Sequence, residues 1–93
     1  MKTLAIEKEI KGINPEYDSE LLRQESKRVW ELMVQGIIRE IYFNQKHNAV
    51  IIMECDTIQT AEKFLNSLPL VSKGLIAFEL MTLLPYTGFE RLF

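Results

Sequence analysis

Two oppositely charged residues, Arg39 and Glu54, lie on segments that the sequence pattern predicts to be neighbouring strands. Pairing these segments across the loop "QKHN" puts Asn44 opposite Ala49. Counting outward from that pair puts Arg39 opposite Glu54. An Arg that a carboxylate orients can bind a ligand carboxylate through two parallel hydrogen bonds. We therefore predict Arg39 and Glu54 as ligand-binding residues, with a structural ion pair at the sheet edge as the alternative.

Two further carboxylates interrupt apolar patterns. Glu79 lies on the side of the last predicted strand that also carries Ala77 and Met81, and Glu25 falls inside the apolar arc of the first predicted helix. A carboxyl group that is buried at such a position has a raised pKa and can act as a general base. Glu79 and Glu25 are therefore the predicted catalytic residues. The alternatives are a salt bridge to a partner subunit for Glu79 and a solvated position for Glu25.

The other residues that could do chemistry give weaker signals. His47 is the only histidine and lies in the predicted hairpin loop, where a solvated side chain is the default. It can shuttle protons only if that loop overhangs a pocket. Cys55 ends a strand with no base beside it. One His and one Cys on different elements make no metal-ligand cluster, so we predict no metal site and no cofactor.

The elements that must position these residues can be predicted from hydrophobic periodicity and capping signals. Four segments are predicted strands, namely 3–10, 37–44, 49–55 and 75–84. One helix runs from Asp18 or Ser19 to about Gln35, where Gly36 is the expected capping glycine. A second helix starts after Asp56 or Thr57, and Pro69 and Gly74 bracket the loop that follows it.

The element order βαββαβ predicts one ferredoxin-like α+β domain over residues 1–93, with an antiparallel four-stranded sheet. In this fold both helices cover the same face of the sheet. The predicted strands are mostly apolar on both faces: Val50 and Ile52 point to one side, and Ile51 and Met53 to the other. A large uncovered apolar face is rare on a soluble monomer, so we predict a symmetric homodimer, with a monomer as the alternative.

Composition excludes several classes of partner. The net charge is −2 with acids and bases interspersed, which does not favour nucleic-acid binding. The apolar runs are too short to span a bilayer, and the start of the chain lacks the apolar block of a signal peptide. A lone cysteine suits a reducing compartment, so we predict a cytoplasmic protein.

Two stretches carry a resemblance to a known family. The element order, "GIIREIYF" after the first helix and "FLNSLPLVSKGLIAFEL" after the second resemble the muconolactone isomerase-like family of dimeric α+β barrels. The resemblance covers nearly the whole chain, and its closest motif is "LPL" with the helix before it. It implies a homodimer, or a larger oligomer, and an isomerase that moves a double bond in a small lactone by proton transfer, without metal or cofactor.

The same resemblance assigns residues. Arg39 matches the family's basic position after the helix-ending glycine, and Tyr42 matches its aromatic position. Gln35 stands where the isomerases have an acid, and "VSKG" stands where they have an aromatic-proline turn. The resemblance therefore implies an anion-binding Arg39 with Tyr42 beside it, but not the isomerases' proton carrier.

The closing stretch "LPYTGFERLF" is apolar and aromatic after Pro85 and Gly88 break the strand. We predict that residues 85–93 form a tail that packs on the partner subunit, with Tyr86 bordering the cleft; the alternative is a tail folded back over its own helices.

The function that we expect is binding of a small, partly apolar, carboxylate-bearing molecule, with cofactor-independent isomerisation. The alternative is a non-catalytic small-ligand-binding or assembly protein.

Overall fold

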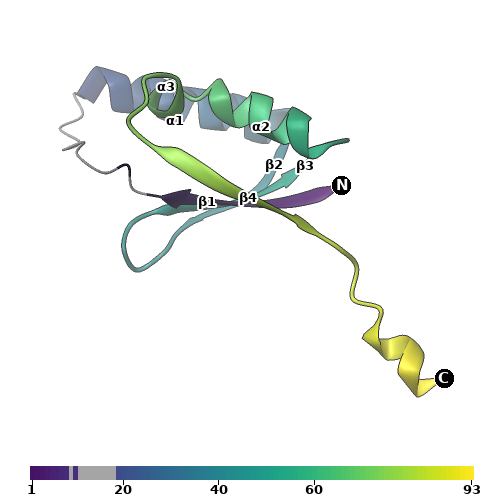
Figure 1. The fold of residues 1–93 in the computed structure, drawn as a ribbon. Coiled ribbons are helices and arrows are strands. Elements are labelled where there is room, and N and C mark those ends of the chain that lie inside the picture. Colours follow the sequence, from purple (N-terminus) through teal and green to yellow (C-terminus); the bar gives the residue numbers. More distant parts are fainter. Residues whose placement is uncertain (9, 11–18) are drawn as a thin grey trace.

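The computed structural model describes residues 1–8, 10 and 19–93 of the chain. Within them the predicted order of strands and helices is confirmed, and one short helix and a terminal 3₁₀ helix are added (Figure 1). The elements are β1 (Lys2–Lys8), α1 (Ser19–Val34), β2 (Ile38–Phe43), β3 (Ala49–Glu54), α2 (Ile58–Asn66), α3 (Pro69–Ser72), β4 (Ala77–Leu83) and the 3₁₀ helix η1 (Gly88–Leu92). The predicted helix cap Asp18 lies outside the described residues.

The four strands form one antiparallel sheet in the order β2-β3-β1-β4, so the two central strands are β3 and β1. The helix α1 leads into β2, the helices α2 and α3 lead into β4, and all three pack on one face of the sheet (Figure 1). This is the ferredoxin-like arrangement that the sequence predicted. None of the described helices is long and apolar enough to cross a membrane.

Local signals explain where the helices begin and end. Gly36 has φ 77°, a left-handed conformation that glycine adopts without steric cost, and it ends α1 as predicted. Thr57, one of the two predicted caps, starts α2: its side-chain oxygen accepts a hydrogen bond from the Thr60 backbone amide at 3.1 Å. Pro69 starts α3 inside the segment predicted to be a loop, since proline fits the first turn of a helix.

The core lies between the helices and the face of the sheet that they cover. Its fully buried side chains come from both layers and include Ala5, Ile38, Ile51, Met53, Leu32, Ala61, Leu65 and Leu68. Apolar residues at alternate strand positions therefore point into the helices, as the periodicity predicted.

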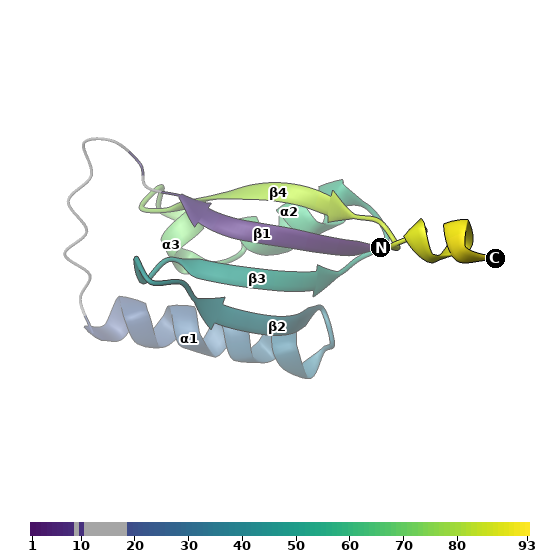
Figure 2. The same ribbon diagram turned by 90° about the horizontal axis from the view of Figure 1, so that it is seen from below.

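The opposite face of the sheet, here called the open face, is covered by none of the described helices; Figure 2 looks onto this side, with the helices behind the sheet. The strand register brings two rows of side chains together there. One row is Tyr42, Val50, Ile6 and Glu79, and the next is Glu40, Ile52, Leu4 and Met81. The centre of the open face is thus apolar, and the carboxylates of these two rows, Glu40 and Glu79, lie on the edge strands β2 and β4.

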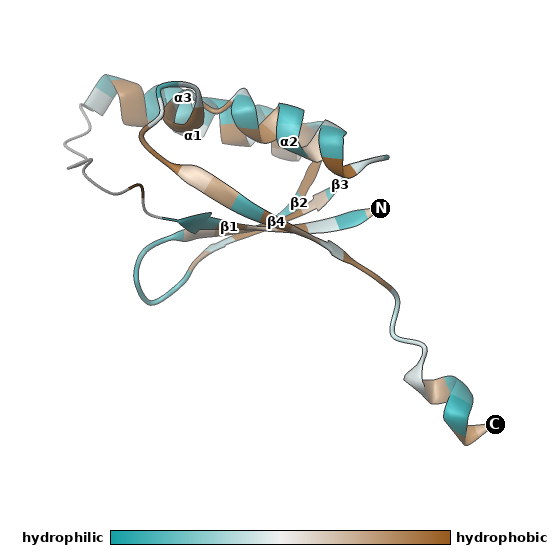
Figure 3. Cartoon of the chain, in the orientation of Figure 1, coloured by the Kyte–Doolittle hydropathy of each residue, from teal (hydrophilic) through white to brown (hydrophobic). Residues whose placement is uncertain are grey.

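The C-terminal tail extends away from the sheet and helices and ends in η1 (Figure 1). Figure 3 colours the end of β4 and parts of η1 as hydrophobic. The side chains of Phe89, Leu92 and Phe93 are exposed. The tail is therefore not folded back over its own helices in this structure, and a packing site for it on a partner subunit stays a prediction.

Candidate functional site

A cavity of about 540 Å³ lies between α1, α3 and the covered face of the sheet, beside the β2–β3 hairpin. Most of its wall is apolar and includes Val29, Ile51, Leu70 and Phe78. This volume is within the range of sites that hold small molecules in proteins. The described lining also includes two carboxylates and the imidazole of His47, so polar chemistry is concentrated in an otherwise apolar space.

Glu25 is the predicted site residue that lines this cavity. It projects from α1, and its Oε1 accepts a hydrogen bond from the Leu70 backbone amide at 2.9 Å. Leu70 lies in the first turn of α3, whose preceding residue Leu68 provides no side-chain cap. Burial raises the pKa of Glu25, the bond from Leu70 lowers it, and the negative charge of Glu7 raises it. Glu25 therefore lines the cavity rather than lying in open solvent, and its catalytic role stays a prediction.

Glu7 is the second carboxylate of the cavity, and the sequence pattern did not single it out. Its Oε2 accepts a hydrogen bond from the Ala49 backbone amide at 3.1 Å. The pairing of β1 with β3 ends one position earlier, at Ile6 and Val50. One position beyond that last pair, the Glu7 side chain accepts the Ala49 amide in place of a backbone carbonyl of β1. The alternation of strand residues could have identified it. Glu7 is two residues after Ala5 and four after Thr3, so it points to the same face of the sheet, and both of those residues are buried under the helices.

His47 lies in the β2–β3 hairpin and contributes to the cavity wall. Its ring stacks on Phe43 with centroids 4.0 Å apart and planes 16° from parallel. The loop therefore overhangs a pocket, which was the condition under which His47 could shuttle protons. The residue is also largely exposed, so its imidazole can exchange protons with water.

The predicted register of this hairpin was wrong by one residue. Phe43, not Asn44, pairs with Ala49. The Asn44 carbonyl accepts the His47 amide at 2.9 Å, and the Asn44 amide donates to the Asn48 carbonyl, so the loop has three residues rather than four. His47 takes φ 63°, the left-handed residue that closes such a loop.

The expected pairing of Arg39 with Glu54 is consequently absent. The register is shifted between Ile38 and Glu40, so Arg39 sits at a bulge and has no partner directly across from it. Its Nε donates to the Gly36 carbonyl at 2.6 Å. Glu54 instead forms an ion pair of 2.8 Å with the amino group of Met1. That hydrogen bond lowers the pKa of Glu54, and the more distant charge of Arg39 acts in the same direction.

The other predicted site residues on the strands lie away from the cavity. Tyr42 and Glu79 belong to the open face and are exposed. The Tyr42 hydroxyl donates to Glu40 at 2.7 Å, and this bond to a carboxylate raises the pKa of Tyr42. The structure thus brings Tyr42, Glu54 and Glu79 to one side of the sheet and Glu25 to the other.

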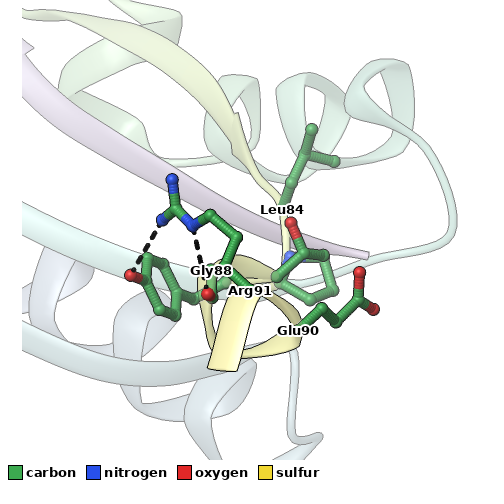
Figure 4. Close-up of a pocket in the computed structure, with 7 residues that line it drawn as sticks. Leu84, Gly88, Glu90 and Arg91 are labelled. Carbon is green, nitrogen blue, oxygen red and sulfur yellow. Dashed lines mark hydrogen bonds between the residues drawn. The ribbon is translucent and has the colours of Figure 1, made fainter. Parts of the chain in front are cut away.

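Tyr86 lines an open recess within the tail (Figure 4). Its hydroxyl accepts a hydrogen bond of 3.4 Å from Arg91, whose Nε also donates to the Gly88 carbonyl at 3.2 Å. The Tyr86 ring meets Phe89 edge-on at 5.0 Å. A Cβ atom at Gly88 would clash with the Tyr86 hydroxyl and the Arg91 guanidinium, so a larger residue there would displace these two side chains.

A metal centre has no support among the described residues, which contain no group of three or more His, Cys, Asp or Glu side chains able to hold an ion. Cys55 is buried, and burial raises the pKa of its thiol, which disfavours a nucleophilic role.

Comparison with known proteins gives a similarity of fold. No family model matches the chain, and no curated protein matches it in sequence. Among solved structures, the chain is similar to 5-chloro-2-hydroxyhydroquinone dehydrochlorinase from Burkholderia phenoliruptrix, in complex with 2,5-dihydroxybenzoquinone. The TM-score is 0.62 and the sequence identity 16%, over 95% of this chain and 98% of the other. At this identity the similarity shows the ferredoxin-like α+β fold, over nearly the full length of both chains.

Proposed function

We propose that this protein binds a small, mostly apolar molecule in the cavity beneath α1 and α3, and that Glu25 moves a proton on it without a cofactor. The observation that carries the proposal is a half-buried carboxyl group with a raised pKa, set in an apolar cavity beside a second carboxylate. A raised pKa brings a carboxyl group closer to the working pH of a general base. The dehydrochlorinase of similar fold is in complex with a small ring, which supports a small cyclic ligand here.

An isomerisation by proton transfer needs one group that removes a proton and a site from which a proton returns to another atom of the substrate. Glu25 is the proposed acceptor. Its hydrogen bond to Leu70 fixes the carboxyl group, which favours a defined direction of attack. His47 is in contact with solvent and lines the same cavity, so it suits the exchange of the proton with water.

The ligand carboxylate that we expected from the sequence has no counter-charge among the described lining residues. Arg39 lies outside the described cavity wall, and the ionisable side chains within it are Glu7, Glu25 and His47. The two acids would repel an anion. The proposal is therefore a small, mostly apolar ligand without a carboxylate group.

The test is hydrogen exchange at the acidic carbon of a small cyclic ketone, 2-indanone, in D₂O. We expect the protein to speed exchange above the buffer rate and Glu25→Gln to lose at least about 100-fold of that acceleration. Glu62→Gln, the same change at an exposed position of α2, is the matched control. Unchanged exchange in Glu25→Gln would exclude Glu25 as the proton carrier.

A non-catalytic ligand-binding protein is the second candidate. The observation that favours it is the hydrogen bond between Glu25 and Leu70, because a carboxylate that anchors α3 has a structural reason to be there. In that case 2-indanone binds in the cavity, and neither the wild type nor Glu25→Gln accelerates exchange.

We also propose that the protein is a homodimer in which two open faces pack together. Support comes from the apolar rows through Leu4, Ile6, Val50 and Ile52, which none of the described helices covers. Arg39, Tyr42, Glu54 and Glu79 would then serve this interface rather than the cavity. The exposed aromatic tail with Tyr86 would add a second contact with the partner subunit.

A further inference from the structure

The two carboxylates of the cavity are held in the same way. Glu25 uses Oε1 to accept the Leu70 amide, and Glu7 uses Oε2 to accept the Ala49 amide. The second oxygen of each carboxylate has no hydrogen bond to the described residues. Each group is therefore fixed by the backbone and still has an acceptor available to a molecule in the cavity.

The two carboxylates also affect one another, since the negative charge of Glu7 raises the pKa of Glu25. No Lys or Arg is among the described lining residues. Two neighbouring acids in a partly desolvated space repel each other unless a positive charge lies between them. The natural complement of this pair is a cation that comes with the ligand.

The rest of the described wall suits a flat apolar group that carries such a cation. Phe78 lies on β4, and the stacked pair of Phe43 and His47 lies on the hairpin. Aromatic faces attract cations and also pack against flat rings. The cavity volume of about 540 Å³ is large enough for one such molecule.

We infer that the ligand of this cavity is a primary amine on a small flat apolar body, whose ammonium group is held by Glu7 and Glu25. This rests on the proposed function, because it names the ligand class of the same cavity. Glu7 and Glu25 give two charged acceptors, so an ammonium group with three donors can bond both. A neutral hydroxyl would bond them less strongly, and a carboxylate would be repelled.

The experiment compares three probes that share a phenyl ring and a two-carbon spacer: phenethylamine, 2-phenylethanol and 3-phenylpropionate. Each is titrated into the full chain, and binding is followed by backbone amide chemical shifts of residues around the cavity. We expect phenethylamine to bind about tenfold more tightly than 2-phenylethanol, and 3-phenylpropionate to bind most weakly.

Two isosteric variants test the carboxylates directly. Glu7→Gln and Glu25→Gln keep an oxygen that can accept the Ala49 or Leu70 amide, so the fold is expected to persist while one charge is lost. Each should reduce the preference for the amine over the alcohol to about threefold or less. Glu62→Gln removes an exposed charge outside the described cavity wall and should leave the preference unchanged.

Acidification gives an independent readout. Phenethylamine stays charged, whereas protonation of Glu25, Glu7 or His47 makes the cavity less negative, so amine affinity should fall as the pH falls. Because burial raises the pKa of Glu25, this fall should begin above the ordinary value of 4.5, and Glu25→Gln should remove that part.

The outcomes separate the two proposals. If the alcohol binds in the cavity as tightly as the amine, or if the Gln variants keep the full amine preference, the inference of a cationic ligand is overturned and the small-molecule cavity still stands. If none of the three probes perturbs the cavity residues, the proposed function fails together with this inference.

Discussion

The two faces of the sheet are both rich in apolar residues, but only one of them is buried by helices. Ile51 and Ile52 are neighbours on β3, and their side chains point in opposite directions. Ile51 is 1% exposed under the helices, whereas Ile52 lies on the open face and is only partly buried. The apolar side chains of the covered face pack against helices of the same chain, with a cavity between them. The apolar side chains of the open face have no described element of the chain to pack against. The same residue type therefore belongs to the core on one side of the sheet and, on the other side, to the face that we propose for dimerisation.

The largest effect is expected on the covered face. Ile51→Thr removes a methyl group from the core and puts a buried hydroxyl in place of a methylene, which should lower the free energy of unfolding by about 2–4 kcal/mol. Urea denaturation measures this. A loss below about 1 kcal/mol would mean that the covered face is not the core that burial indicates.

The matched change on the open face should act on association instead. Ile52→Thr keeps a β-branched side chain, so we expect the isolated subunit to lose little stability. In a face-to-face dimer the change occurs twice, which should weaken dimerisation by about 1–2 kcal/mol, or roughly tenfold. Sedimentation over a concentration series gives the dissociation constant. A wild-type protein that stays monomeric at micromolar concentration would contradict the proposed face-to-face dimer.

The tail offers a smaller test of the same contrast. Deleting residues 86–93 removes exposed aromatic side chains from a segment that extends away from the sheet and helices (Figure 1). We expect the dimer to dissociate more readily while the unfolding midpoint of the monomer changes by no more than a few degrees. An unchanged oligomer mass after the deletion would argue against a tail that packs on the partner.

The smallest effect concerns the cavity. Burial raises the pKa of Glu25 in the folded protein above the ordinary value of 4.5, so the charged form is penalised by folding. This penalty is absent below pH 4.5, grows as the pH rises from there to the folded pKa, and is complete above it. Glu25→Gln should therefore be more stable than the wild type near neutral pH, and the difference should vanish at about pH 4.

Urea denaturation at both pH values measures this difference. A variant that is less stable near neutral pH would show that the charged hydrogen bond to Leu70 outweighs the cost of burial.

Much of the fold could be predicted because its signals are local. Gly36 had to end a helix in a left-handed conformation, and Thr57 had to cap the next one. Alternation along β3 was enough to assign Ile51 and Ile52 to opposite faces of the sheet. The short helix α3 was missed because four residues give too little periodicity to recognise.

The candidate site was harder to predict because it depends on register and packing. A three-residue loop closed by His47 replaced the expected four-residue loop, and that single step separated Arg39 from Glu54. Glu25 was recognised because a charge inside an apolar arc is conspicuous on a helix. Glu7 was not recognised, since two more charged residues follow it in "IEKE" and only the tertiary packing distinguishes it from them.

The bond between Glu7 and Ala49 has a practical consequence. At this point the amide at the start of β3 is protected by a side chain rather than by a neighbouring strand. A ligand ammonium group that binds the other oxygen of Glu7 makes the carboxylate a weaker hydrogen-bond acceptor for the Ala49 amide. This amide should therefore exchange with solvent faster when the ligand occupies the cavity. One backbone amide at the start of β3 can thus report whether the cavity is occupied, without any knowledge of the reaction.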